Sequence, residues 1–404
     1  MAKSFVEEEI SRGVQLSIIN LIDGLIEYAH NARASDIHIE PEERRVRVRL
    51  RIDGVLHDSF ILPKEIHSEI ITRIKVLSGL RTDEHQAPQD GRFRLTFKKL
   101  GNVDIRVSIT PTYYGEDAVM RLLSAKGETF TVDSLGFSAH DKEKIHTALR
   151  RPFGMILSTG PTGSGKTTTL YSFIKILNTS EVSIITIEDP IEYSIQGIDQ
   201  IQVNPRTGLT FADGLRSILR QDPNIIMVGE IRDEETARIA INAALTGHLL
   251  LSTLHTNDAP TTLPRLLDMK IEPFLIASTV NIALGQRLVR KICADCKTEK
   301  QLTPDELKSL AEILPKTMNA DEQKFYSGTG CAKCNNTGYI GRIGIYEVLL
   351  MDDDVRAAVV RKVSADEIKT IAIKNGMTTM VEDGIGKAMA GITTIEEILR
   401  VIHE

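Results

Sequence analysis

The chain has 404 residues, of which 42% are hydrophobic and 26% charged, a globular composition long enough for two or three domains. Its 49 basic and 55 acidic residues give a net charge of −6, which provides no global positive field, so we expect no sequence-specific nucleic-acid binding. The longest run without charged residues, 239–257, contains polar residues and histidines and is not typical of a membrane span. The start, MAKSFVEEEI, lacks the apolar stretch of a signal peptide, so we expect a cytoplasmic protein.

Residues 1–125 switch between helical and strand periodicity, which predicts a small α+β domain. Apolar residues at helical spacing predict a helix over Val14–Tyr28, and alternation predicts a strand over Arg45–Ile52 with arginines on its polar face. Two interpretations of these arginines remain open, a solvated face paired with acidic neighbours or a contact with phosphate or another subunit. The acidic neighbours are Glu40, Glu42 and Glu43, and further strands are predicted over Gly91–Phe97 and Asn102–Ile109.

Breaks in the pattern predict a linker over 126–134 and a second domain over 135–404. In this second domain, short β-branched runs alternate with helical patterns, which predicts an α/β fold with a largely parallel sheet wrapped by helices. A mixed segment at 290–341 interrupts the pattern, and the tail over Val355–His403 predicts several short helices. The strands are predicted over Met155–Ser158, Ser183–Ile187, Ile225–Val228 and Leu249–Thr253.

A glycine-rich motif, GPTGSGKT, fits GxxxxGK[ST] between an apolar strand and a helix-forming stretch. Its backbone N–H groups would point at phosphate oxygens, Lys166 would reach the β and γ phosphates, and Thr167 would ligate Mg²⁺. The flanking elements disfavour the alternative of a chance glycine-rich turn. No NKxD-type guanine reader is present, so we expect ATP as the nucleotide. The predicted nucleotide-binding residues are Gly160, Pro161, Thr162, Gly163, Ser164, Gly165, Lys166, Thr167 and Thr168.

Two acidic segments, EDPIE from Glu188 and GEIRD containing Glu230, follow two of the predicted strands. Ligands of open α/β sheets lie beyond the carboxyl ends of the strands, so we expect both segments to face the phosphates. One carboxylate would hold the metal and another would orient the attacking water. A helix N-cap or a loop carboxylate is the alternative for each.

A further predicted strand lies between two histidines, His248 and His255. A strand end beside the glycine-rich loop would place His255 where it senses the γ-phosphate. A structural role is an equally good interpretation of His248.

Four cysteines form two CxxC pairs that are separated by the 34 residues from Lys297 to Gly330. Two such pairs complete a tetrahedral Cys₄ set with no position left for water, which predicts structural Zn²⁺. Four free thiols and an iron–sulfur centre are the alternatives. The predicted ligands are Cys293, Cys296, Cys331 and Cys334.

With these motifs in this order, the chain resembles the secretion-superfamily ATPases, most closely the assembly motor of type IV pili and its type II secretion counterpart. The resemblance runs from SDIHIEP at Ser35–Pro41 to the C-terminal helices. It implies a RecA-like P-loop ATPase domain preceded by a smaller, PAS-like α+β domain and interrupted by a zinc-binding insertion at 290–341. Such an insertion is typical of assembly and secretion motors and favours them over retraction motors.

The resemblance also implies roles for single residues. Glu188 matches the glutamate of the Asp box that polarises water, and Glu230 matches the Walker B residue that acts at Mg²⁺. His248 and His255 lie in a segment that matches the His box. Asn224 stands where the family often has a second Asp, so the resemblance implies no role for a second carboxylate at this position.

Five arginines complete the implied site. Arg106 and Arg121 match arginines that the N-terminal domain delivers to nucleotide, where they would stabilise charge during phosphoryl transfer. Surface ion pairs are the alternative for both. Arg216, Arg220 and Arg232 are implied to line the site or a subunit interface.

We therefore expect a homo-hexameric ATPase with Mg²⁺ and Zn²⁺, peripheral at the inner face of the cytoplasmic membrane. It would extend a pilus or pseudopilus through an inner-membrane platform protein and associated pilus or secretion components. The alternatives are a DNA-uptake or conjugation motor and a nucleotide-gated scaffold with little turnover. We expect no counterpart here of the extra N-terminal domain with which many such ATPases dock on a membrane partner. A sequence that is part of a longer protein and a naturally short member are the two alternatives.

Overall fold

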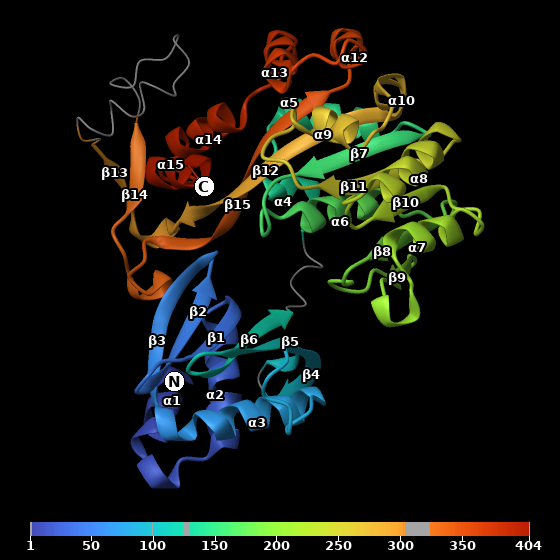
Figure 1. Ribbon diagram of the computed structural model, residues 1–404. Helices are drawn as coiled ribbons and strands as arrows, with labels where there is room; N and C mark the ends of the chain where they lie inside the picture. The colour runs from blue at the N-terminus through green and yellow to red at the C-terminus, as the bar shows by residue number, and fades with distance from the viewer. Residues whose placement is uncertain (1, 99, 124–129, 302, 304–323, 404) are drawn as a thin grey trace. The chain divides into compact units, whose positions relative to one another are not determined.

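The computed structural model describes residues 2–98, 100–123, 130–301, 303 and 324–403. The chain divides into two compact units, Met1–Lys126 and Gly127–Glu404, and each is described by itself (Figure 1). None of the described helices combines the length and the apolar character that crossing a lipid bilayer requires. The predicted linker, 126–134, lies partly outside the described residues.

The first unit is built on a six-stranded antiparallel sheet of order β3-β2-β1-β6-β5-β4. Alternate residues of its strands are buried, as the period-2 pattern of the sequence requires. The strand over Arg45–Ile52 has the bounds that the alternation predicts. The strands are β1 (Ala34–Pro41), β2 (Arg45–Ile52), β3 (Val55–Pro63), β4 (Gln89–Phe97), β5 (Gly101–Thr112) and β6 (Gly115–Leu123).

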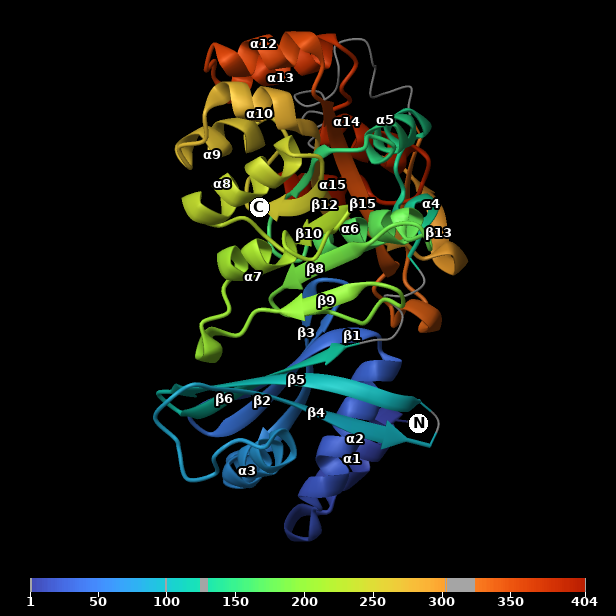
Figure 2. The ribbon, with the colours of Figure 1, turned by 90° about the vertical axis from the view of Figure 1, so that its right-hand side faces the viewer.

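Helices cover one face of this sheet (Figure 2). The helix predicted from Val14 begins only at Ile18, because Gly13–Gln15 forms a 3-10 turn and the Ser17 side chain caps the Asn20 N–H. The other face of the sheet carries the charged side chains. The helices are α1 (Ala2–Ser11), α2 (Ile18–Asn31) and α3 (His67–Ser78).

The second unit is an α/β structure around a seven-stranded sheet of order β15-β12-β7-β11-β10-β8-β9. All neighbouring strands are parallel except β12 and β15, so the prediction of a largely parallel sheet is confirmed. The strands are β7 (Gly154–Thr159), β8 (Ile184–Glu188), β9 (Asp199–Gln202), β10 (Ile225–Val228), β11 (Leu249–Leu254), β12 (Val280–Ile292) and β15 (Tyr339–Leu350).

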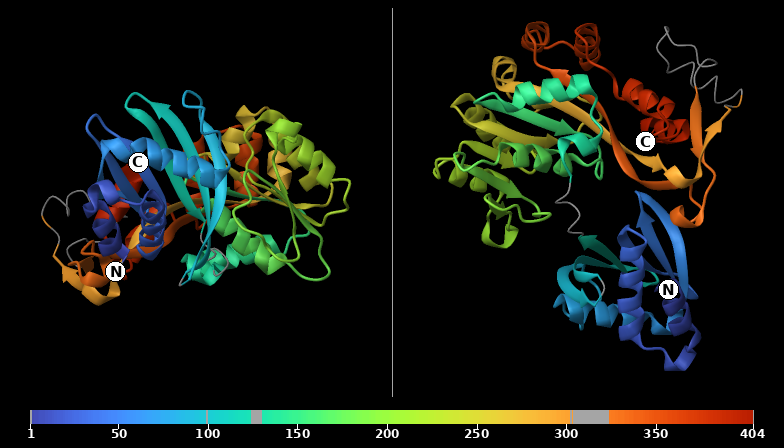
Figure 3. Two further views of the ribbon diagram at one scale, coloured as in Figure 1. Left: turned by 90° about the horizontal axis from the view of Figure 1, so that it is seen from below. Right: turned by 180° about the vertical axis from the view of Figure 1, so that it is seen from behind.

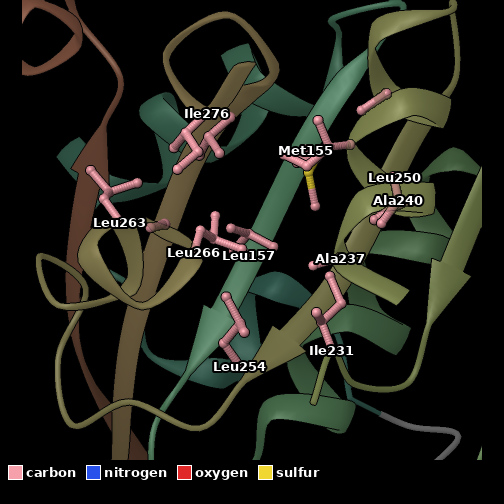
Figure 4. Close-up of a cluster of buried hydrophobic side chains, with 14 of the residues drawn as sticks. Met155, Leu157, Ile231, Ala237, Ala240, Leu250, Leu254, Leu263, Leu266 and Ile276 are labelled. Atoms are coloured by element: carbon pink, nitrogen blue, oxygen red, sulfur yellow. The ribbon is translucent and has the colours of Figure 1, made fainter. Parts of the chain in front are cut away.

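Two hydrophobic layers sandwich this sheet, since successive residues of β7 point to opposite faces. Met155 and Leu157 lie in the layer of Figure 4, and Ile156 lies in the other. On the first face pack α7 (Phe211–Ile218), α8 (Glu234–Leu245), α9 (Thr262–Asp268), α10 (Pro273–Thr279), α12 (Asp353–Val360) and α13 (Ala365–Lys374). On the second face pack α4 (Val132–Leu135), α5 (Ala139–Leu149) and α6 (Lys166–Leu177).

The long strands β12 and β15 extend beyond the sheet, as the orange ribbons in the right-hand view of Figure 3 show. Their extended ends share a small core with α14 (Met380–Met389), α15 (Ile395–His403) and β14 (Phe325–Gly328). β13 (Lys297–Lys300) pairs with β14. Residues 302 and 304–323 of the predicted insertion at 290–341 lie outside the described residues.

Candidate functional site

Four adjacent parallel strands, β7, β11, β10 and β8, end at the same edge of the second sheet. The glycine-rich loop follows β7, His255 follows β11, Glu230 follows β10, and Glu188 is the last residue of β8. Four motifs that are distant in the sequence are therefore brought to one edge, where ligands of α/β sheets bind.

The glycine-rich loop joins the buried strand β7 to the start of α6. The Lys166 ammonium is buried and donates to the carbonyls of Gly160 (2.7 Å) and Pro161 (3.0 Å). Burial lowers the pKa of Lys166, while the carboxylate of Glu230 acts in the opposite direction. Lysine, helix N-terminus and loop amides thus form a site with the chemistry of a phosphate cradle.

Glu230 lies at the centre of a small charged cluster. One of its carboxylate oxygens is 2.9 Å from Nε2 of His255, and the other accepts from the Arg232 guanidinium. The hydrogen bond to Glu230 raises the pKa of Arg232. The structure therefore joins three predicted site residues, and Glu230 is also close enough to Lys166 to affect that ammonium.

The carboxylate of Glu188 is buried and held by three donors. Thr186 Oγ1 donates to Oε1 over 2.7 Å, Gln200 Nε2 donates to the same oxygen over 3.1 Å, and the Tyr171 hydroxyl donates to Oε2. Burial first, and Glu188 second, raise the pKa of the Tyr171 hydroxyl, which keeps its proton. A carboxylate offers about four acceptor sites, so one remains on Oε2 for a water or ligand donor.

The loop that carries His255 is attached to the end of β7. Thr159 Oγ1 accepts a hydrogen bond from the Thr256 N–H over 3.0 Å and lies 2.9 Å from the Thr256 carbonyl oxygen. Thr159 immediately precedes the glycine-rich loop, so these contacts fix the His255 loop relative to the phosphate cradle.

Three predicted residues of the second unit, His248, Arg216 and Arg220, have other partners. His248 precedes β11, a strand of six residues, and thus lies roughly 20 Å from the end that carries His255. Its Nδ1 lies 3.0 Å from the Ala243 carbonyl. On α7, Arg216 pairs with Asp213 and Glu235, and Arg220 donates to the Arg216 carbonyl and to Ser217 Oγ.

In the first unit, Arg106 and Arg121 lie directly opposite each other on β5 and β6. Arg92 on β4 lies opposite Arg106, and Asp36 on β1 lies opposite Arg121. We call Arg92, Arg106 and Arg121 the arginine row. Arg121 donates to Asp36 over 2.9 Å, whereas Arg92 and Arg106 are exposed and have no hydrogen bond or ion pair with the described part of the chain. Like charges directly opposite on adjacent strands are unfavourable, so the repulsion within the arginine row lowers the stability of the sheet.

The arginines of β2 have a different environment. Three of them pair with the carboxylates of Glu40 and Glu42, as the solvated-face interpretation expects, whereas Glu43 makes no hydrogen bond or ion pair with the described residues. The pairs are Arg45 with Glu42, Arg47 with both glutamates, and Arg49 with Glu40. The fourth arginine of β2, Arg51, lies 3.7 Å from Asp36, the carboxylate that also accepts from Arg121.

The four cysteines form one cluster in the second unit, and their sulfur atoms all lie within 4.8 Å of one another. The Sγ–Sγ distances are 3.8 Å for Cys293–Cys331, 3.9 Å for Cys296–Cys334 and 3.7 Å for Cys331–Cys334. A tetrahedron with metal–sulfur bonds of about 2.3 Å has edges of about 3.8 Å, so this donor set fits one Zn²⁺ ion.

Sequence reasoning missed Tyr171 and Gln200, which hold Glu188, and Arg92, which extends the arginine row. No sequence motif marks Tyr171 or Gln200, because each of them lies outside the segment that contains their shared partner, Glu188. Arg92 lies in a predicted strand, but only the register with β5 places it opposite Arg106.

Comparisons with known proteins decide the family. The model of the family described as "Type II/IV secretion system protein" matches residues 13–400. The chain belongs to the type II/IV secretion system protein family. The resemblance predicted from the motifs is thereby confirmed.

Relatives in this family include two kinds of protein. The chain is 47% identical over 401 residues to the type IV pilus assembly ATPase PilB of Thermus thermophilus, covering 98% of this chain and 45% of that protein. It is 48% identical over 389 residues to the type II secretion system protein E of Xanthomonas campestris, covering 96% and 68%. The chain thus spans less than half of the first relative and about two thirds of the second.

Two solved structures share the fold of this family member. The pilus retraction motor PilT with bound ADP matches with a TM-score of 0.62 and 27% identity, covering 93% of this chain and 95% of that one. The Legionella pneumophila ATPase DotB matches with a TM-score of 0.68 and 23% identity over 95% of both chains. The predicted combination of an α+β unit and a P-loop α/β unit is confirmed.

Proposed function

We propose that this member of the type II/IV secretion system protein family is a Mg²⁺-dependent ATPase that powers assembly of a type IV pilus or a type II secretion pseudopilus. The observation that carries the proposal is the convergence of the glycine-rich loop, Glu230 with His255, and Glu188 at one sheet edge. The relatives named as a pilus assembly ATPase and as a type II secretion protein support the biological role.

Each group at the edge has a proposed task. Lys166 and the loop amides bind the phosphates of ATP, and Thr167 and Glu230 hold Mg²⁺ directly or through water. Glu188 orients the attacking water through the acceptor site that its three donors leave on Oε2. His255, fixed by Glu230, lies where a terminal phosphate would be sensed.

The exposed arginines supply positive charge for the phosphates in an assembled, homo-hexameric state. Arg106 and Arg121 stabilise the charge that develops during phosphoryl transfer, and Arg216, Arg220 and Arg232 contribute to the site or to a subunit interface. The hexamer acts peripherally on an inner-membrane platform protein at the cytoplasmic face.

The cysteine cluster is proposed to bind structural Zn²⁺, which links the chain just after β12 to the chain just before β15. Removal of the metal with a strong chelator should lower the melting temperature, and added Zn²⁺ should restore it. Metal analysis that finds no zinc in the purified protein, together with an unchanged melting temperature, would refute this part of the proposal.

The test of the ATPase proposal is phosphate release from MgATP by the purified chain beside Lys166→Ala. We expect turnover in the wild type and a loss of at least about 100-fold in the variant, since the lysine contacts the transferring phosphoryl group. Equal rates in both would reject the site. MgATP binding without turnover, even in assembled hexamers with platform protein, would favour the scaffold alternative.

A further inference from the structure

A buried glutamine on β12, Gln286, lies beside the glycine-rich loop. Its side chain is 1% exposed, and its strand runs parallel to β7, with Gly285 opposite Thr159 at the point where the loop begins. The sequence pattern did not identify this residue, because it lies in a strand that carries no known motif.

The amide of Gln286 makes two hydrogen bonds that differ in direction. Nε2 donates to the carbonyl oxygen of Ser164 over 2.8 Å, inside the glycine-rich loop. Oε1 accepts from the Ser158 hydroxyl over 3.0 Å, in the strand that precedes the loop. Because a carbonyl oxygen can only accept, Ser164 requires Nε2 on its side, and the Ser158 hydroxyl then donates to Oε1.

The bond to Ser164 has a consequence for the next amide. A peptide group is planar and trans, so its C=O and N–H point in opposite directions. When Gln286 holds the Ser164 carbonyl, the N–H of Gly165 is directed away from β12. In a glycine-rich loop of this kind, the inward N–H groups are those that bind phosphate oxygens.

The backbone of β12 also determines where glycine is required in the loop. A Cβ on Gly160 would lie 2.3 Å from the Gln286 carbonyl oxygen, and Gly160 has a φ of +141°. A Cβ on Gly165 would lie 3.3 Å from Gln286 Nε2. The first and last glycines of the loop are thus packed against the same residue.

We propose that Gln286 is a positioning residue for nucleotide binding, which orients the Ser164–Gly165 peptide so that the Gly165 N–H donates to a phosphate of MgATP or MgADP. Gln286 itself does not contact the nucleotide. This inference rests on the proposed function of the glycine-rich loop.

The test compares Gln286→Met, which keeps the length and loses both polar atoms, with wild type. Loss of one oriented donor should weaken MgADP binding about ten-fold in calorimetric titration. Because the contact exists before and during phosphoryl transfer, KM for MgATP should rise by a similar factor, with kcat within about two-fold. Gln286→Glu keeps the acceptor for Ser158 but lacks the N–H donor, so it should weaken binding at least as much.

Asn281→Leu is the matched control, since Asn281 lies on the same strand, is 4% exposed and donates to the Phe153 carbonyl before β7. A merely structural effect would lower the melting temperature in Gln286→Met and Asn281→Leu alike and leave KM unchanged in both. That result, or wild-type affinity in Gln286→Glu, would overturn the inference.

The control Lys166→Ala separates this inference from the proposed function. If Lys166→Ala loses MgADP binding while both Gln286 variants retain it, only the role of Gln286 is wrong. If Lys166→Ala also binds as wild type does, the phosphate site itself is wrong, and the inference fails with it.

Discussion

The two groups of charged residues proposed to act on nucleotide differ in how the fold holds them. At the sheet edge of the second unit, Glu188 accepts three hydrogen bonds and Glu230 pairs with His255 and Arg232. In the arginine row of the first unit, Arg92 and Arg106 have no partner within the described residues.

This difference separates groups that the chain itself orients from groups that the described fold leaves exposed. The carboxylates at the sheet edge are preorganised, which is the usual basis of electrostatic catalysis. The arginine row costs some folding free energy through like-charge repulsion, and within the described fold only Arg121 of the three arginines has a carboxylate partner, Asp36. In the proposed function, the phosphates of the nucleotide would offset this repulsion.

The largest effect is expected from a change at the preorganised edge. Glu230→Gln should lower turnover by at least about 100-fold, because a neutral amide no longer attracts Mg²⁺, Arg232 and His255. Steady-state phosphate release measures the effect, and titration should show that MgATP still binds. Glu234→Gln is the control, since that half-buried glutamate at the start of α8 pairs with Arg238 and Lys270 instead. Equal rates in the two variants would remove Glu230 from the site.

A smaller effect is expected from Tyr171→Phe, which deletes one of the three donors to Glu188. Turnover should fall about ten-fold, and stability should fall by about 1–3 kcal/mol, the cost of a buried carboxylate that loses a donor. Tyr346→Phe is the matched control, because this buried tyrosine donates to the Leu135 carbonyl instead. Chemical unfolding and turnover of both variants would separate the two effects. Equal losses of turnover would show that the hydroxyl acts only on stability.

The smallest effect concerns a carboxyl of the first unit that opposes folding. Burial, with Glu40 second, raises the pKa of Asp117 from 3.8 to about 6. As the pH rises, Asp117 therefore loses its proton in the unfolded chain at a lower pH than in the folded unit. Its contribution to stability falls as the pH rises from about 4 to about 6. Asp117→Asn should stabilise the unit by about 1 kcal/mol at pH 8 after solvent screening, with no gain near pH 3. Unfolding curves at both pH values would check this prediction. A gain in stability only near pH 3 would show that the pKa of Asp117 is not raised in the folded unit.

Sequence patterns predicted the parts of the fold that depend on local order. The strand over Ile225–Val228 has the predicted bounds, since a short buried run between breakers determines both ends. The helix predicted from Val14 starts later, because the cap at Ser17 and the turn before it compete with the apolar stripe. The strands β12 and β15 were not predicted, since their long antiparallel pairing is set by tertiary contacts.

In the candidate site, too, features with a local sequence pattern could be predicted and contacts between distant segments could not. Each motif was visible by itself, and the rule for parallel strand ends placed Lys166, Glu188, Glu230 and His255 at one edge. Partners such as Tyr171 and Gln286 were not visible, because a hydrogen bond between distant segments leaves no local pattern. The separation of His248 from His255 was equally hidden until the direction of β11 was known.

The most direct test of the contrast between the two groups is a paired measurement on Arg106→Gln, of turnover and of the free energy of unfolding without nucleotide. Turnover should fall by at least about 100-fold, as expected for an arginine that stabilises phosphoryl transfer. The free energy of unfolding should be unchanged or higher by a few tenths of a kcal/mol, about the size of one like-charge contact. Full turnover, or a loss of stability that accounts for the loss of turnover, would contradict the account.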